Sequence, residues 1–377
     1  MQHALAARGF AGARAEAAAH GMRPITVLLD GLAFDTLATL GREARASGID
    51  CLAGEDWALL SGGASALAGL IRPDTTRLPA ELGDELSRAL GAALEPAAAW
   101  ITARGAVSLE RPVVAGILNL TPDSFSDGGR YLEPEAALHH AEQLLQDGAD
   151  MIDLGAESTR PGRPEPVSAE VEWSRIAPVL TALEREHPRV PLSVDTVKAT
   201  TARRALDAGA WAINDVSGLR LEPEIADVCV TAGAGLILMH SRGSVGDMAS
   251  YEHAHYDDVA VEVRRELESS VERAIAGGVS RPQLVVDPGL GFAKTPEQTF
   301  TVVRELPVLG SMGLPIMVGP SRKRFLGAVT GQAVAQRDPA TAAACVSAYF
   351  QGAVMFRVHA VALTREALAV AHALRSP

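Results

Sequence analysis

The sequence predicts an α/β protein whose main part is a (β/α)8 (TIM) barrel, preceded by a small α/β extension. From Val113 onward one unit recurs: a segment with helical periodicity, often a Gly-Ala pair, a short apolar strand and then polar residues. Eight such units fill roughly 265 residues, close to the usual barrel size of about 250 residues. An open, doubly wound sheet is the alternative, but no GxGxxG motif follows the first strand.

Residues 1–110 are expected to form the extension, whose topology and role the sequence leaves open. Its carboxylates Asp30, Glu55 and Asp56 are expected to be surface charges or helix caps. Residues 100–109 alternate around Gly105 as in a hairpin, which we expect to act as a plug or lid of the barrel. The predicted elements are the strands Ile25–Leu29, Cys51–Ala53 and Ala58–Leu60, and the helices Leu32–Ala46, Ala64–Ile71 and Glu81–Ala97.

Residues 111–377 are expected to form the barrel. The eight predicted strands are Val113–Leu118, Met151–Asp153, Val190–Asp195, Trp211–Asp215, Leu236–His240, Gln283–Asp287, Pro315–Gly319 and Val354–His359. Helices are predicted between most of them, for example Pro134–Gln146, Ala169–Glu186, Thr200–Ala208, Asp257–Ala276 and Pro339–Phe350. Because strands and helices alternate, the strands should pair in parallel through right-handed crossovers.

Composition limits the classes of function. A net charge of -12 argues against a general binder of nucleic acid or anionic membranes, since both need broad basic surfaces. Three cysteines, far apart, form neither a disulfide framework nor a zinc spacing, which favours a reducing compartment. No apolar run approaches the roughly 18 residues of a membrane span, and the first 22 residues lack the apolar core of a signal peptide. A cytoplasmic protein is therefore expected.

Polar residues follow every predicted barrel strand. In a barrel the carboxyl ends of the strands meet at one face, so these residues should become neighbours although they are distant in the chain. In strand order they are Asn119; Asp153 and Glu157; Asp195; Asn214 and Asp215; His240; Asp287; Ser321, Arg322 and Lys323; and Arg357 with His359. Polarity scattered at random would not select the end of every strand, so an active site is predicted at this face.

Asp195, Asn214 and Asp287 form a first group, from the middle strands. Carboxylates accept hydrogen bonds from ring N–H and amino groups, and an amide both donates and accepts. This group therefore suits a planar heterocycle with alternating donors and acceptors, such as a 2-amino-4-oxo ring.

The second group is cationic and comprises Arg160, Lys323, Arg357 and His359. Cations from several barrel loops favour an anion site, most simply for phosphate or diphosphate. Asn119 could supply an oxygen ligand to Mg²⁺ that also holds phosphate oxygens. No Ser-His-Asp arrangement, His/Cys metal spacing or Schiff-base lysine is evident. The predicted site binds and orients two partners and stabilises a departing phosphate.

With these motifs the sequence closely resembles the dihydropteroate synthases over about residues 112–375. The matching motifs occur in family order: GILNLTPDSFSDGG (116–129), IDLGAESTRPG (152–162), SVDT (193–196), INDVSG (213–218), LMHSRG (238–243), DPGLGFAKT (287–295), GPSRK (319–323) and RVH (357–359). The resemblance implies condensation of 6-hydroxymethyl-7,8-dihydropterin diphosphate with 4-aminobenzoate, giving 7,8-dihydropteroate and diphosphate. It also implies a homodimer.

The resemblance further implies a role for each matching residue. The pterin is expected to be held by Asp195, Asn214, Asp287 and Lys323, and the diphosphate by Asn119, Arg357 and His359, with Asn119 reaching Mg²⁺. The aminobenzoate pocket, which would also take sulfonamides, is expected to comprise Thr159, Pro161, Phe292 and Ser321. Catalytic roles are expected for Lys323 and for two closing loops that contain Asp123, Asp127 and Arg160.

One departure from the family keeps two alternatives open. The family usually has Asp after RVH, where this chain has Ala360, and loss of that helix cap is expected to cost about 0.5–2 kcal/mol. A non-catalytic paralogue that binds a pterin without condensing it is therefore conceivable. A pterin-binding methyltransferase acting on a corrinoid protein is the other alternative, but it has no need of the STRPG loop or of the SRK and RVH cations.

Overall fold

The computed structural model describes residues 24–29, 31–70, 78–94, 96–121, 134–157 and 167–375. Contacts divide the chain into two compact units, Met1–Pro96 with Ser311–Gly313, and Ala97–Gly310 with Leu314–Pro377. The second is the barrel unit and the first is the N-terminal unit. The division places the hairpin with the barrel, since it falls earlier than the boundary predicted between residues 110 and 111.

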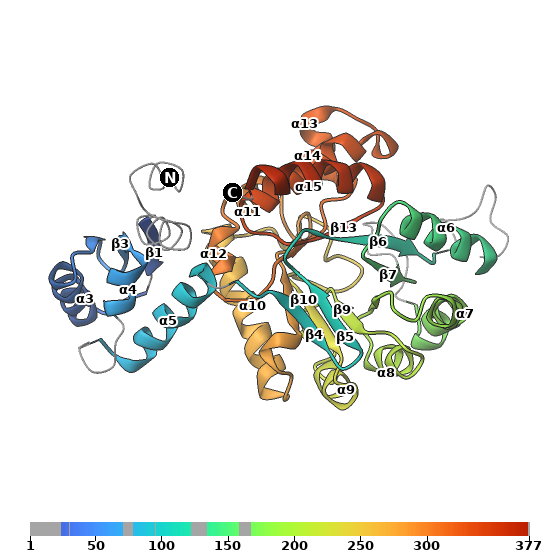
Figure 1. The fold of residues 1–377 in the computed structure, drawn as a ribbon, viewed down its shortest axis with the longest axis horizontal. Helices are drawn as coiled ribbons and strands as arrows, with labels where there is room; N and C mark the ends of the chain where they lie inside the picture. The colour runs from blue at the N-terminus through green and yellow to red at the C-terminus, as the bar shows by residue number, and fades with distance from the viewer. Residues whose placement is uncertain are drawn as a thin grey trace, which may run out of the picture. The chain divides into compact units, whose positions relative to one another are not determined.

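The barrel unit contains one sheet of eight parallel strands, with the order β11-β10-β9-β8-β7-β6-β13-β12 (Figure 1). An isolated parallel bridge between Val286 and Ile316 joins the two edges, so the sheet closes as a barrel rather than remaining open. The predicted (β/α)8 fold is confirmed. The strands are β6 (Val113–Asn119), β7 (Met151–Gly155), β8 (Leu192–Asp195), β9 (Ala212–Asp215), β10 (Gly235–Met239), β11 (Leu284–Asp287), β12 (Met317–Val318) and β13 (Met355–Val358).

Two strands differ from their predicted bounds in an informative way. Strand β12 has only two residues because Pro315 and Pro320 flank it, and proline cannot donate to a ladder. Strand β7 continues two residues beyond Asp153, because Leu154 and Gly155 still pair with Val194 and Asp195 of β8. Asp153 therefore lies inside the barrel, one layer below the strand ends.

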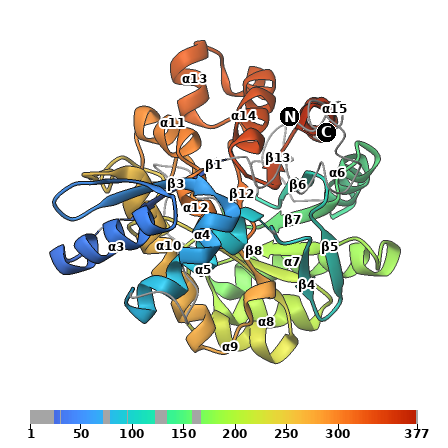
Figure 2. The ribbon, with the colours of Figure 1, turned by 60° about the vertical axis from the view of Figure 1, so that its left-hand side comes forward.

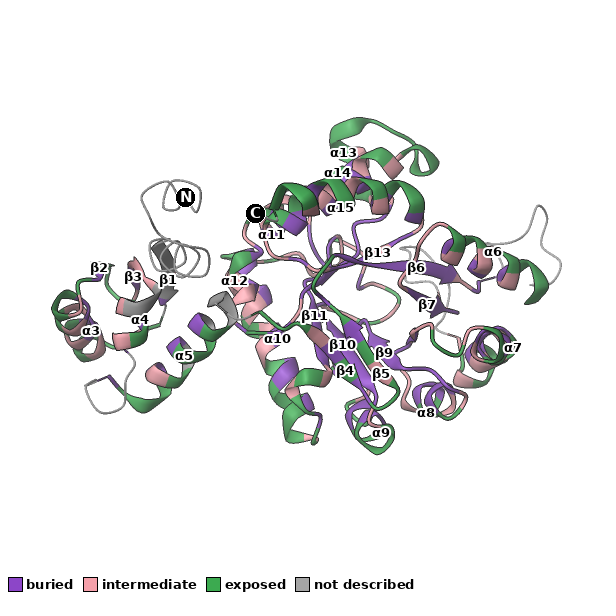
Figure 3. Cartoon of the chain, in the orientation of Figure 1, coloured by how far each residue is buried: buried purple, intermediate pink, exposed green. Residues whose placement is uncertain are grey.

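Helices surround the barrel (Figure 2). Most of them bury one face, as the alternation of purple and green along them shows (Figure 3). The described helices of this unit are α6 (Pro134–Gln146), α7 (Ala169–Glu186), α8 (Ala199–Asp207), α9 (Ile225–Ala232), α10 (Val259–Ala276), α11 (Pro296–Arg304), α12 (Pro307–Gly310), α13 (Arg324–Thr330), α14 (Asp338–Phe350) and α15 (Val361–Arg375). The bounds of α6 and α7 are those predicted from the sequence. Among all described helices, none combines the length and the apolar character that a bilayer crossing requires.

The hairpin β4 (Ala99–Thr102) and β5 (Gly105–Ser108) closes the amino-terminal end of the barrel. Trp100 is 1% exposed, packs in one cluster with the first residues of several strands, such as Val113 and Met151, and donates from Nε1 to the carbonyl of Gln283 at 2.7 Å. A Cβ on Gly235 would lie 2.4 Å from the Trp100 ring, so this strand residue must be small. Of the two predicted possibilities, the hairpin is the plug, at the end opposite the strand carboxyl termini.

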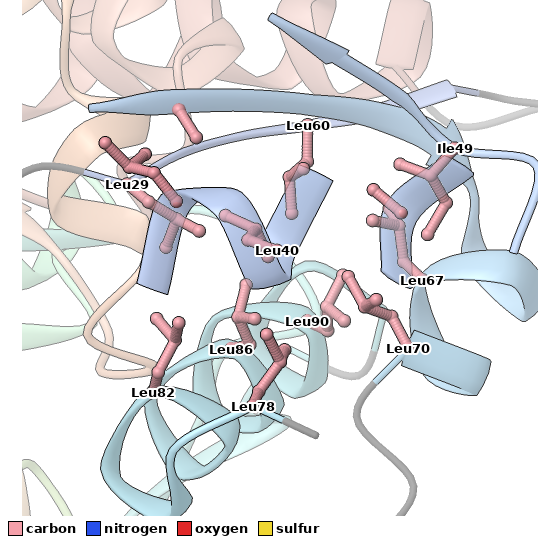
Figure 4. Packing of buried hydrophobic residues seen from close by; sticks show 13 residues of the cluster. Leu29, Leu40, Ile49, Leu60, Leu67, Leu70, Leu78, Leu82, Leu86 and Leu90 are labelled. Atoms are coloured by element: carbon pink, nitrogen blue, oxygen red, sulfur yellow. The ribbon is translucent and has the colours of Figure 1, made fainter. Parts of the chain in front are cut away.

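The N-terminal unit is an antiparallel sheet of three strands in the order β1-β3-β2, with helices. Leucines of the sheet and helices point toward one another and form its own core (Figure 4). The elements are β1 (Pro24–Leu29), α3 (Phe34–Ala46), β2 (Asp50–Ala53), β3 (Ala58–Gly63), α4 (Ala64–Leu70) and α5 (Ala80–Leu94). The predicted α/β character of this part is confirmed.

Candidate active site at the carboxyl end of the barrel

The residues of the predicted first group lie at the carboxyl ends of three barrel strands: Asp195 and Asp287 are the last residues of β8 and β11, and Asn214 is the second-last of β9. Asp195 of β8 pairs in register with Asn214 of β9, and Asp287 of β11 pairs with Met239 of β10. All three side chains are buried or half-buried at the same end of the barrel. The structure thus brings together residues that lie up to 92 positions apart in the chain.

Arg357 of β13 bridges two carboxylates. Its Nε donates to Asp153 Oδ2, and its Nη2 donates to Asp195 Oδ2 at 3.0 Å. Asp153 also accepts from Ser193 Oγ and Asn214 Nδ2. Burial raises the pKa of Asp195 to about 7; the charge of Arg357 opposes this rise and that of Asp153 adds to it. Burial alone would lower the pKa of Arg357, but the charges of Asp153 and Asp195 raise it. The positive charge of Arg357, which is expected to hold an anion, is therefore already partly neutralised by these two carboxylates.

Lys323 lies beside Asp287 and the segment that follows β11. Its Nζ donates to the carbonyl of Leu290 at 2.5 Å and stands 4.2 Å from the centre of the Phe292 ring. Burial lowers the pKa of Lys323 to about 8, although the charge of Asp287 acts in the opposite direction. Burial likewise raises the pKa of Asp287, whose Oδ1 accepts from Gly289 N at 2.7 Å.

Ser321, His359 and Asn119 form a hydrogen-bonded row. His359 Nδ1 lies 2.8 Å from Ser321 Oγ, and its Nε2 lies 3.3 Å from Asn119 Nδ2. The donor and acceptor roles of the two ring nitrogens depend on the tautomer, and a protonated His359 would donate from both. Asn119 Oδ1 is the oxygen of this side chain that could bind a cation.

Asn119 fits a role as Mg²⁺ ligand, because Mg²⁺ prefers oxygen and commonly takes few protein ligands together with substrate phosphates. Two clusters of His and carboxylates capable of holding a metal occur within the described ranges: Glu142, Glu186 and His187, and Asp247, Glu252 and His253. Neither includes Asn119.

Five predicted site residues lie outside the described residues: Asp123, Asp127, Thr159, Arg160 and Pro161. The two residues that flank the segment 158–166, Glu157 and Val167, are described and hydrogen-bonded to each other. Glu157 Oε1 accepts from Val167 N at 2.8 Å, and Glu157 Oε2 accepts from Lys198 Nζ at 2.6 Å.

Several side chains at this end were not predicted from the sequence. Lys294, 1% exposed, lies 2.8 Å from Nδ1 of His240, whose Nε2 lies 3.0 Å from Glu266 Oε2 on α10. Glu172 of α7 is also fully buried and accepts from Thr196 and Thr201. Lys294 does lie within the DPGLGFAKT motif, but the motif alone does not show which way the lysine points.

Comparison with known proteins identifies the class. Residues 115–359 match the family of pterin binding enzymes. The chain is 44% identical over 266 residues to the dihydropteroate synthase of Synechocystis sp., with 70% of this chain and 91% of that protein covered. Residues 1–96, the larger part of the N-terminal unit, lie outside the family match, which begins at residue 115.

Two structures of the Xanthomonas albilineans dihydropteroate synthase are also similar. The one with 4-aminobenzoic acid is 41% identical, with a TM-score of 0.67, and 72% of this chain and 96% of that chain are covered. The one in complex with 7,8-dihydropteroate is 39% identical, with a TM-score of 0.65 and coverages of 72% and 97%. Fold and site thus define a pterin-binding enzyme built on a barrel. Within that class, the chain belongs to the dihydropteroate synthase family, which decides against the methyltransferase alternative.

Proposed function

We propose that the chain condenses 6-hydroxymethyl-7,8-dihydropterin diphosphate with 4-aminobenzoate to give 7,8-dihydropteroate and diphosphate in folate biosynthesis. One observation carries the proposal: Asp195, Asn214 and Asp287 end strands of one barrel face, and Lys323 reaches the same face. In a member of the dihydropteroate synthase family, these groups suit the pterin ring.

The pterin would be held by both kinds of hydrogen-bonding group. The carboxylates of Asp195 and Asp287 accept from ring N–H and amino groups, and Asn214 donates and accepts. The ammonium of Lys323, already fixed by the Leu290 carbonyl, would lie against the ring. These groups orient the pterin and do not react with it covalently.

The diphosphate would be held by Arg357, His359 and Mg²⁺. Because Arg357 faces the two carboxylates Asp153 and Asp195, the protein offers the anion little net positive charge there. Asn119 Oδ1 would hold Mg²⁺, which supplies charge stabilisation to the departing diphosphate when it is bound.

The reaction needs one bond formed and one broken. The amine nitrogen of 4-aminobenzoate attacks the methylene carbon, the carbon–oxygen bond to diphosphate breaks, and the amine loses a proton. The electron-rich pterin shares the developing positive charge. Phe292 and Ser321 are proposed to contact 4-aminobenzoate, and the segments containing Asp123, Asp127, Thr159, Arg160 and Pro161 are proposed to close over the reacting atoms and exclude water.

The chain is further proposed to act as a cytoplasmic homodimer. Its three cysteines are free, as expected in a reducing compartment. An apolar groove of about 430 Å³ between α14 and α15, lined by residues such as Phe350, Val370 and Leu374, is a surface that a second copy would cover. Light scattering coupled to size-exclusion chromatography tests the dimer.

The decisive experiment is diphosphate release by the purified protein with pterin diphosphate and Mg²⁺, with and without 4-aminobenzoate. Release that requires both substrates, with dihydropteroate formed in step, supports the proposal. Pterin binding without turnover would instead identify the non-catalytic paralogue, and Ala360→Asp would then be the next variant. A protein that binds neither substrate would overturn the proposal.

A further inference from the structure

Lys294 is a buried lysine whose hydrogen-bonding capacity is filled by uncharged groups. Burial lowers its pKa to about 7, although the charge of Asp287 acts in the opposite direction. Its Nζ lies 2.8 Å from His240 Nδ1, 3.2 Å from the Gly289 carbonyl and 3.1 Å from the Phe292 carbonyl. An ammonium has three hydrogens, so these three acceptors use all of them. Since Nδ1 accepts, His240 is neutral and carries its hydrogen on Nε2, which donates to Glu266.

The choice of lysine at this position is specific. Lysine occurs only at positions 198, 294 and 323, so 31 of the 34 basic residues are arginine. An ammonium is a compact donor that can sit among three converging acceptors, whereas a planar guanidinium would require a larger opening. Lys294 is therefore matched to its surroundings by shape as well as by charge.

The carbonyls bound by Lys294 belong to the turn that follows β11. Gly289, Gly291 and Ala293 have φ values of +64°, +76° and +45°, a conformation that a side chain disfavours. A Cβ on Gly289 would stand 1.9 Å from the His240 carbonyl oxygen. The turn is thus held in a tight and intrinsically unfavourable shape.

The same turn supports the pterin site. It presents the Leu290 carbonyl to Lys323 Nζ, its Gly291 lies under the Lys323 side chain, and it carries the Phe292 ring. All three contacts come from the turn whose Gly289 and Phe292 carbonyls accept from Lys294.

We infer that Lys294 is a positioning residue of the pterin site: held by His240 and Glu266, it fixes the turn 289–292 and so places Lys323 and Phe292. Lys294 does not itself contact the substrate. The inference rests on the proposed function, because it concerns how that site is assembled.

The test is a thermodynamic cycle on pterin diphosphate affinity, measured by calorimetric titration. Lys294→Met is expected to weaken binding about tenfold, the scale on which a displaced binding group acts. In a Lys323→Ala background the same change is expected to weaken it less than about twofold, since the group that Lys294 places is then absent. Lys294→Arg should bind no better than Lys294→Met.

A residue with a merely structural role would behave differently. Lys294→Met would then lower the melting temperature and leave the affinity unchanged, or its effect would add fully to that of Lys323→Ala; either result overturns the inference. So would full affinity in Lys294→Arg. If Lys294→Met does not fold, Lys294→Gln, which keeps N–H donors, replaces it in the cycle.

Arg365→Met is the matched control. Arg365 donates to the Gly148 carbonyl and pairs with Asp150, at the other end of the barrel, so its loss also removes a cation from a backbone turn. It should reduce stability without changing pterin affinity. Failure of the wild-type protein to bind pterin diphosphate would contradict the proposed function itself, whereas normal wild-type binding with an unchanged Lys294→Met affinity contradicts only this inference.

Discussion

Two basic residues at the carboxyl end of the barrel strands have different kinds of hydrogen-bond partner. Arg357, from β13, faces the carboxylates of Asp153 and Asp195. Lys294, after β11, hydrogen-bonds to two carbonyls and an imidazole, while the charges of Asp287 and Glu266 oppose the effect of burial on its pKa. The first cluster, Arg357 with Asp153 and Asp195, therefore pairs a cation directly with carboxylates. The second cluster, Lys294 with His240 and Glu266, places the amine of Lys294 among uncharged hydrogen-bond acceptors.

The difference teaches what each cluster can do. A guanidinium between carboxylates compensates their charge, and Arg357 opposes the rise in the pKa of Asp195 that burial causes. An ammonium surrounded by carbonyls cannot neutralise them but fixes the backbone that bears them. The first cluster accordingly governs the charge of the site, and the second governs its shape.

The largest effect is expected from Arg357→Met. It leaves Asp153 and Asp195 adjacent without their counter-ion, and breaking such a buried pair costs about 3–5 kcal/mol. Urea unfolding should show this loss. Combining Arg357→Met with Asp195→Asn removes one of the unpaired charges and should restore part of the stability. An Arg357→Met protein as stable as the wild type would show that the carboxylates are not held by this charge.

The second cluster should respond to acid. Burial, together with the positive charge of Lys294, lowers the pKa of His240 from 6.5 to about 4. Between these values the unfolded chain binds a proton at His240 that the native protein excludes. Relative to a His240→Phe variant, the wild-type unfolding free energy should therefore fall as pH decreases from 6.5 to 4, by up to roughly 3 kcal/mol. The raised pKa of Asp195 acts in the opposite direction, and equally in both proteins. Besides Lys294, the charged groups facing His240 are Glu266 and Arg242. Urea titrations across this range would measure the slope, and a His240→Phe variant with the same slope would contradict its assignment.

Lys323 connects the two clusters, since Asp287, Arg357 and Asp195 all act on its charge while Leu290 accepts its hydrogen bond. Lys323→Ala removes a charged donor from the proposed pterin site, a loss of about 1.5–3 kcal/mol or about 10–100-fold in affinity. Calorimetric titration with pterin diphosphate measures it. Normal affinity in this variant would refute the placement of the pterin.

The smallest effect is expected at Ala360, which follows β13, the strand that carries Arg357. Ala360 directly precedes α15 and its carbonyl accepts from Thr364 N, but its side chain offers no cap. Ala360→Asp should stabilise the protein by about 1 kcal/mol in urea unfolding, through capping and the helix dipole. Ala360→Asn separates capping from charge. An unchanged midpoint in both variants would show that this helix end is already satisfied.

The fold could be predicted because its signals are local. Each barrel strand is a short apolar run that ends at a polar residue, so the order of residues along the chain is enough to place Asn119, Asp195, Asn214 and Asp287 at one face. That prediction needs only the direction of the strands, which the alternation with helices supplies.

The partners of these side chains could not be predicted, because they depend on depth and direction. The sequence placed Asp153 at a strand end, but β7 continues to Gly155, so Asp153 lies lower and pairs with Arg357. Lys294 receives its contacts from His240, directly after β10, and from its own turn, segments separated by more than forty residues. A lone lysine before a helix gives no local sign that it points inward.

The placement of all three lysines at the carboxyl end of the strands has a practical consequence. Lys294 is buried, so reagents that acylate lysine amines find their side-chain targets at Lys198 and Lys323, next to the proposed substrate site, and coupling the protein to a surface through these lysines should block that site. The half-buried thiol of Cys51, in the N-terminal unit, offers an attachment point in the other unit. Because the chain has only three lysines, acylation can also be used to detect substrate binding. Substrate that covers Lys323 should protect it from acylation, and mass spectrometry of the peptide that contains Lys323 would measure that protection.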